Sequence, residues 1–194
     1  MLENLLKYNI LLASNSPRRK ELLGGLDINY KVVSLPDIDE SFPDNLPKEE
    51  VAEFIAQKKA LAYSDLLEKD TLIITADTVV LYNDEIMGKP RDEYEAKEML
   101  QRLSGKTHKV ITGVTIRTAK EDHSFSSITK VTFALLSDEE INYYVQKFKP
   151  FDKAGSYGVQ EWIGYIGVEN IEGSYYNVMG LPIQRLYSLL KIIQ

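Results

Sequence analysis

The chain has 194 residues, a formal net charge of −6, two histidines and no cysteine. The lack of cysteine excludes a disulfide framework, a thiol nucleophile and a cysteine-ligated zinc site, and the acidic balance argues against general binding to nucleic acid or to anionic membranes. No apolar run approaches the roughly 20 residues of a membrane span, and the first residues lack the pattern of a signal peptide. We therefore expect a cytoplasmic protein.

The N-terminal part of the chain predicts a strand, a tight loop and a helix. The apolar run 10–13 is typical of a short buried strand, while Ser16 is a good N-cap and Pro17 suits the first helical position. Arg18 and Arg19 then fall in the first turn, where the helix dipole favours carboxylates. Two cations beside backbone N–H groups indicate a bound anion, most simply a phosphate; the alternative is a capped helix with two solvated arginines.

The next segments predict a strand at 30–34, an acidic loop at 36–41 and a helix from about 46 to 67. Lys59 falls on the apolar stripe of this helix. A lysine in that position must either extend its ammonium to solvent or point into a polar cleft.

Two segments offer carboxylates for a metal ion or for catalysis. The acidic loop carries Asp37, Asp39 and Glu40, whose oxygens suit Mg²⁺ or Mn²⁺, although this loop taken alone would be interpreted as a solvated one. The β-branched run 72–75 predicts a buried strand that ends at Asp77, at the edge where ligands gather in α/β sheets. Asp77 can hold a metal or act as a base for water, and a turn-forming aspartate is the equally weighted alternative.

The remaining elements mix helices and strands, with both crossover and hairpin connections. We expect strands at 79–82, 86–87, 110–116, 131–135 and 163–168, capped helices at 92–103 and 137–148, and a last helix at 182–193. This order predicts a single domain of the α/β class (mixed α+β) over residues 1–194, built around a mixed sheet.

Three further polar residues are candidates for the site. Lys89 could complete a cationic clamp with Lys59, although alone it would be interpreted as a surface lysine. Gln160 ends a Gly-rich loop, and its amide suits the edge of a base, with bonding to the loop backbone as the favoured alternative. His108 stands beside a strand start and indicates a structural role. The sequence has no P-loop, dinucleotide fingerprint or nucleophile elbow, which favours direct attack by a metal-activated water.

In this order, the motifs resemble those of the Maf family of nucleoside triphosphate pyrophosphatases, from Ile10 to the C-terminal helix. Each motif is weak alone, but the ordered set is very specific. The matching segments are LASNSPRR at 12–19, ADTVV at 76–80, GKPRD at 88–92, LSG at 103–105 with His108, TGV at 112–114, DKAGSYGVQ at 152–160, GS at 173–174 and NVMGLP at 177–182.

The resemblance implies an elongated fold of two lobes with a deep central cleft. It also implies cleavage of a nucleoside triphosphate between the α and β phosphates, with Mg²⁺ or Mn²⁺ as cofactor and with a monophosphate and pyrophosphate as products. The Pro-Arg-Arg, Asp-Thr-Val and Tyr-Gly-Val-Gln motifs are similar to those of the family branch that acts on dTTP and UTP. Many family members are dimers, so a homodimer is one of the assemblies to expect.

The resemblance further implies roles for single residues. Asp77 would be the proton acceptor and, with Glu40, a metal ligand. The residues that would contact the triphosphate are Ser14, Arg18, Arg19, Lys59 and Lys89. Those tied to the choice of base are Arg18, Thr78 and Gln160. Lys58 directly precedes Lys59, so the sequence leaves the assignment of the functional lysine open between the two.

Other classes of function stay open at this stage. One is a nucleotide-binding regulator linked to septum formation in cell division, which would bind nucleotides without hydrolysing them. Another is a nucleotidyltransferase, which would need a second substrate. A nucleic-acid binder is the weakest alternative because the chain is acidic.

Overall fold

The computed structural model describes residues 2–35 and 38–194, and it confirms a mixed α/β fold. The strands are β1 Asn9–Ala13, β2 Lys31–Val33, β3 Thr71–Tyr82, β4 Glu85–Met87, β5 Thr107–Thr118, β6 Asp122–Phe133 and β7 Val168–Glu172. The helices are α1 Pro17–Gly24, α2 Val51–Ala62, α3 Glu93–Leu103, α4 Asp138–Phe148, α5 Trp162–Gly167, α6 Tyr175–Met179 and α7 Ile183–Leu190. In the described residues the strands form one seven-stranded sheet in the order β2-β1-β3-β5-β6-β7, with β4 paired to β3. Nowhere in these residues is a helix long and apolar enough to cross a membrane.

The chain divides into two compact units, each assembled from separate stretches of sequence. The first unit contains the residues up to Asp77, Thr112–Ser127 and Gly180–Gln194, and the second contains Thr78–Ile111 and Ile128–Met179. The strands β3, β5 and β6 each continue from one unit into the other.

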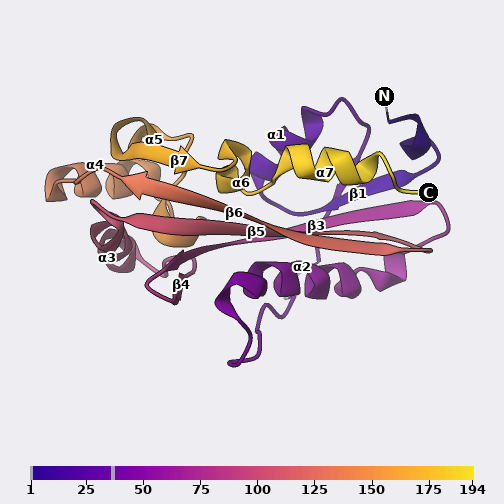
Figure 1. The fold of residues 1–194 in the computed structure, drawn as a ribbon, viewed down its shortest axis with the longest axis horizontal. Coiled ribbons are helices and arrows are strands. Elements are labelled where there is room, and N and C mark those ends of the chain that lie inside the picture. The colour runs from indigo at the N-terminus through magenta and orange to yellow at the C-terminus, as the bar shows by residue number, and fades with distance from the viewer. Residues whose placement is uncertain (1, 36–37) are drawn as a thin grey trace. The chain divides into compact units, whose positions relative to one another are not determined.

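The first unit is built on parallel strands. Leu12 of β1 pairs with Val32 of β2 on one side and with Ile74 of β3 on the other. Figure 1 shows α2 on one face of these strands, and α1 and α7 on the opposite face. Apolar residues on all three helices are buried against the strands, which makes this a helix–sheet–helix arrangement; they are Leu22, Leu23, Val51, Ile55, Leu186 and Leu190.

Two local features hold α2 against the sheet. The Thr75 hydroxyl on β3 donates to the Ala56 carbonyl at 2.7 Å, in a fully buried position. On β5, Gly113 lies so close to the helix backbone that a Cβ added there would stand 2.3 Å from the Ala52 carbonyl carbon. A glycine is therefore required where this helix crosses the sheet.

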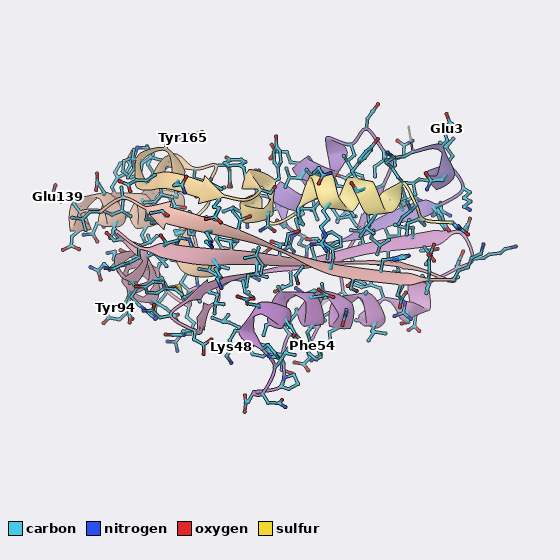
Figure 2. All side chains as sticks on the ribbon, in the orientation of Figure 1. Glu3, Lys48, Phe54, Tyr94, Glu139 and Tyr165 are labelled. Carbon is cyan, nitrogen blue, oxygen red and sulfur yellow. The ribbon has the colours of Figure 1, made fainter. Side chains whose placement is uncertain are left out.

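The second unit pairs strands in antiparallel fashion and places α3 beside α4 (Figure 1). Asn83 and Asp84 both have positive φ, which gives β3 and β4 the tight two-residue hairpin turn that asparagine and aspartate tolerate. The α4 helix begins with the expected capping box of Ser137 and Glu140. Figure 2 shows the Tyr165 side chain projecting outward, in agreement with its 80 % exposed surface.

A buried aromatic cluster forms part of the core of the second unit. His108, Phe133 and Tyr157 meet edge to face with ring centroids 4.9–5.4 Å apart. The imidazole Nε2 and the Tyr157 hydroxyl are 2.7 Å apart. Burial lowers the pKa of His108 to about 4, so the ring is neutral at pH 7. These contacts agree with the structural role that the sequence indicates for His108.

The structure corrects three of the expected elements. Residues 72–75 and 79–82 belong to one continuous strand, β3, so Asp77 lies within a strand and not at its end. The segment 163–168 forms the helix α5 and the strand starts at Val168; a short apolar run alone does not distinguish the two. The long helix expected from 46 to 67 is reduced to α2, with single 3₁₀ turns before and after it.

One expected cap also differs in detail. Asp92 caps α3 by accepting from the Glu95 backbone N–H, as expected. The Glu95 carboxylate, however, accepts from the backbone N–H and the guanidinium of Arg91, and this ion pair replaces the reciprocal bond of a capping box.

Candidate active site

A lysine ammonium joins two carboxylates in the first unit. Lys59 Nζ lies 2.7 Å from Asp77 Oδ1 and 2.8 Å from Glu40 Oε1. The side chains of Lys59 and Asp77 are 13 % and 14 % exposed, while that of Glu40 is 47 % exposed. Lys59 therefore points into a polar cluster, which is one of the two orientations expected from its position on the apolar stripe of α2.

Strand β3 and helix α2 set the distance between Asp77 and Lys59. The bond from Thr75 to Ala56 fixes the helix to the strand two residues before Asp77 and three residues before Lys59. The pairing of β3 with β1 ends at Ile74, and its pairing with β4 begins at Val80, so Asp77 lies between these two paired stretches. Although Asp77 is not at the end of its own strand, it follows the point where the neighbouring parallel strand ends.

Lys58, the residue before Lys59, holds the loop that carries Glu40. Lys58 Nζ donates to Asp39 Oδ2 at 2.7 Å and to the Ser41 carbonyl at 2.8 Å. Hydrogen bonds from Lys58 and Ser41 lower the pKa of Asp39 well below its usual range. The adjacent lysines therefore have different partners: Lys58 binds the residues on either side of Glu40, and Lys59 binds Glu40 itself. Asp37, the remaining acidic candidate, lies outside the described residues.

Arg19 reaches from α1 to the backbone next to Asp77. Its Nε donates to the Gly180 carbonyl and its Nη1 to the Ala76 carbonyl, both at 2.8 Å. Burial lowers the pKa of Arg19, and the nearby carboxylate of Asp77 opposes this shift. The sequence did not reveal these two carbonyl partners, although it marked both of their segments as motifs. They provide a local reason for an arginine in the first turn of α1.

The loop before α1 is ordered by its own serines. Ser16 caps the helix, and its side chain accepts from the Arg19 backbone N–H at 3.5 Å. Ser14 Oγ accepts from the Ser16 backbone N–H at 3.2 Å. Arg18 is half-buried, and its charge lowers the pKa of Arg19. The first unit thus brings Arg19, Lys59 and both carboxylates together, with Ser14 on the adjoining loop and Arg18 in the first turn of α1.

The other three candidate residues belong to the second unit. Thr78 follows Asp77 directly on β3 and is half-buried. Lys89 is exposed in the loop between β4 and α3, and this loop is tied to the Gly-rich loop by a bond from the Gly155 N–H to the Gly88 carbonyl at 3.0 Å. Gln160 is half-buried, and its Oε1 is a buried acceptor with no hydrogen-bond partner among the described residues.

The donor set of the first unit fits a hard divalent cation in one respect. Glu40 and Asp77 are two carboxylates that converge on a single positive charge. The described residues contain no group of three or more histidine, cysteine or acidic side chains that could hold a metal alone. In proteins, Mg²⁺ is usually held by one or two carboxylates together with the phosphates of the substrate.

Comparison with known proteins adds a family to this geometry. The family model described as Maf-like protein matches residues 9–193. A dTTP/UTP pyrophosphatase of Phocaeicola vulgatus is 62 % identical over 191 residues, which cover 98 % of this chain and 99 % of the relative. Proteins of the same description from Parabacteroides distasonis and Porphyromonas gingivalis are 58 % and 55 % identical, over 98 % of this chain and 99 % and 97 % of theirs.

Solved structures show a related fold at low sequence identity. The Ham1 protein of Staphylococcus aureus superposes with a TM-score of 0.54 at 16 % identity and covers 93 % of this chain and 99 % of its own. A HAM1 protein from Coxiella burnetii gives a TM-score of 0.52 at 15 % identity, over 96 % of this chain and 100 % of its own. At this identity the likeness concerns the fold alone.

Proposed function

The chain belongs to the Maf family, and from this premise we propose that it hydrolyses dTTP and UTP to the nucleoside monophosphate and pyrophosphate. The names of relatives more than 55 % identical support this substrate class. The observation that carries the proposal is Lys59, whose ammonium holds Asp77 and Glu40 within 2.8 Å beside the half-buried guanidinium of Arg19. Such a mixture of cations and carboxylates is what phosphoryl chemistry requires of a protein.

In the proposed reaction, the cluster around Lys59 accepts one proton from water and promotes the breaking of one phosphorus–oxygen bond. Asp77 orients a water and accepts its proton as the water oxygen attacks the α phosphorus. The bond from the α phosphorus to the bridging oxygen breaks, and pyrophosphate leaves with the electron pair. Ser14 binds a phosphate oxygen, and charge on the triphosphate is offset by the cationic side chains of Arg18, Arg19, Lys59 and Lys89.

Glu40 and Asp77 would hold the Mg²⁺ or Mn²⁺ ion. When bound, that ion supplies Lewis-acid polarisation of the phosphate oxygens. Lys59 positions both carboxylates, and Lys58 holds the loop from which Glu40 extends. Arg18, Thr78 and Gln160 select the base, with the amide of Gln160 suited to the edge of a pyrimidine. We also propose a cytoplasmic location, and the family resemblance supports a homodimer, which light scattering of the purified protein tests.

The direct test is an assay of the purified protein with dTTP or UTP in the presence of Mg²⁺ or Mn²⁺. We expect one monophosphate and one pyrophosphate for each triphosphate consumed, and no turnover in excess EDTA. Release of a diphosphate and inorganic phosphate would overturn the position of cleavage. Nucleotide binding without metal-dependent hydrolysis would instead favour the regulator that the sequence left open, an alternative that the named relatives do not favour.

A further inference from the structure

One tyrosine hydroxyl forms hydrogen bonds with both ends of the turn that contains Gln160. Tyr144 on α4 is fully buried, and its hydroxyl accepts from the Gly158 backbone N–H at 3.1 Å. The same hydroxyl donates to Glu161 Oε2. The Glu161 backbone N–H in turn donates to the Gly158 carbonyl at 2.9 Å and closes the turn. Gln160 is therefore held between two residues that share a single anchor in the core of the second unit.

A buried lysine holds the other oxygen of that carboxylate. Lys153 Nζ lies 3.1 Å from Glu161 Oε1 and 2.7 Å from Asp152 Oδ1, and its side chain is 8 % exposed. Burial and the bond to Glu161 raise the pKa of Tyr144, so this hydroxyl keeps the proton that it donates. Removing the Lys153 ammonium from water is costly unless carboxylates pair with it, as Glu161 and Asp152 do here.

The Glu161 carboxylate and the Gln160 amide both lie against Gly158. A Cβ on Gly158 would stand 3.1 Å from Gln160 Nε2 and from Glu161 Oε2. An acidic oxygen favours the NH₂ side of a neighbouring amide and repels its carbonyl oxygen. The opposite atom of the amide, Oε1, is the buried acceptor without a partner in the described part of the chain. Buried acceptors of this kind call for a specific explanation.

We propose that Tyr144 and Glu161 are positioning residues that hold the turn carrying Gln160 and thereby set the orientation of its side chain toward a bound base. A glutamine amide has both donor and acceptor groups, which suits the edge of uracil or thymine with its imide N3–H and carbonyl oxygens. The inference rests on the proposed function, because it requires Gln160 to contact the base. It goes beyond that function by assigning the orientation to a buried network whose members do not touch the substrate.

The test is a double-mutant cycle on UTP hydrolysis. Tyr144→Phe and Glu161→Gln are each measured alone and in combination with Gln160→Ala, in the full chain, with kcat and KM determined separately. We expect each positioning variant to raise KM for UTP roughly tenfold, the factor that matches the loss of about one hydrogen bond, with a smaller change in kcat. In the Gln160→Ala background the same substitutions should have little further effect, because they act through Gln160.

The matched control is Tyr143→Phe, which deletes a hydroxyl from the neighbouring residue of α4. The Tyr143 hydroxyl is bonded to Lys147 on the exposed side of the helix, and its loss should leave both constants unchanged. Effects of Tyr144→Phe and Glu161→Gln that simply add to that of Gln160→Ala would overturn the proposal. If Gln160→Ala itself leaves KM for UTP unchanged, the role of Gln160 in the proposed function is wrong and the positioning role falls with it. Glu161→Gln has almost the shape of the native residue, so the test does not depend on whether Tyr144→Phe folds.

Discussion

Asp77 is the residue on which the proposed reaction depends most. Replacement by asparagine keeps the shape of the side chain but removes the charge that accepts a proton and holds the cation. We expect Asp77→Asn to lower kcat by about 10²–10⁴, the usual contribution of a general base. Initial rates of pyrophosphate release, with circular dichroism as the check on folding, measure this effect.

A matched aspartate precedes the same strand. Asp70 is exposed and accepts from the Asn9 side chain at 3.1 Å, outside the cluster around Lys59. Asp70→Asn should therefore keep the rate of the unchanged protein. A variant Asp77→Asn with more than half of the original rate would remove Asp77 from its role.

Substitutions at the two adjacent lysines distinguish the effect of a charge beside Asp77 from the effect of anchoring the loop that carries Glu40. Lys59→Met leaves Asp77 and Glu40 without their shared cation, and we expect kcat to fall by about 10²-fold or more. Lys58→Met releases Asp39 and Ser41, whose loop carries Glu40. Because that contact is largely exposed, we expect at most a several-fold loss, accompanied by a higher Mg²⁺ concentration for half-maximal activity. Titration of the metal in each variant measures the difference, and equal effects of the two substitutions would contradict it.

At the scale of the element, the position of α2 depends on one glycine. A methyl group at residue 113 would stand 2.3 Å from the backbone of Ala52 and Glu53, which cannot rearrange as a side chain can. Gly113→Ala should therefore lower the free energy of unfolding by about 1–3 kcal/mol or more, and should lower activity because Lys59 moves with its helix. Urea denaturation and initial rates test the two effects.

Gly88→Ala is the stability control for Gly113→Ala. A methyl group there would meet no described atom within 4 Å, so the expected change is neutral or a stabilisation of a few tenths of a kcal/mol. Comparable destabilisation by both substitutions would show that steric contact with α2 is not the cause.

Most elements could be predicted from the sequence because their signals are local. Ser16, Asp92 and Ser137 cap their helices as expected, since a cap is formed within three residues. The helix at 162–167 was missed, because six residues with no side-chain cap carry too few turns to show a helical period. The continuity of β3 through Asp77 was missed because polar residues in a strand are tolerated where they meet a long-range partner, here Lys59.

In the candidate site, too, residue types could be predicted from the sequence but contacts between distant residues could not. Residue types in the motifs pointed to Asp77, Glu40 and the cationic residues, and the structure brings Asp77, Glu40, Lys59 and Arg19 together. The carbonyl partners of Arg19 lie 57 and 161 residues away in sequence, and spacing alone cannot reveal such contacts. The choice between Lys58 and Lys59 likewise needed the three-dimensional path of the loop at 39–41.

At the scale of the whole molecule, stability should depend on pH through His108. Burial lowers its pKa to about 4, whereas an imidazole in the unfolded chain titrates near 6.5. Below pH 6.5 the unfolded state therefore binds more protons, and stability falls as the pH is lowered towards 4. By pH 5, His108 has lowered the free energy of unfolding by about 2 kcal/mol relative to its value above pH 7.

Urea denaturation at pH 5 and pH 8 measures this dependence. In His108→Gln the difference in unfolding free energy between the two values should shrink by about that amount, because glutamine does not titrate. A pH dependence unchanged by the substitution would assign it to other groups.

The first unit is assembled from separate stretches of the sequence, which limits the order in which its contacts can form during synthesis. The Gly180 carbonyl accepts from Arg19, and the carbonyls of Leu190 and Ile193 accept from Asn4, across 161 to 189 residues of sequence. A ribosome-bound chain that has exposed the first 77 residues can therefore pair Arg19 with the Ala76 carbonyl but still lacks the Gly180 carbonyl. The contacts around the proposed catalytic aspartate can be completed only after Gly180 has been synthesised, and such long-range closure is slow. Until α7 has also been synthesised, one face of the parallel strands of this unit lacks the cover that its buried residues Leu186 and Leu190 provide, and exposed apolar surface of this kind promotes aggregation.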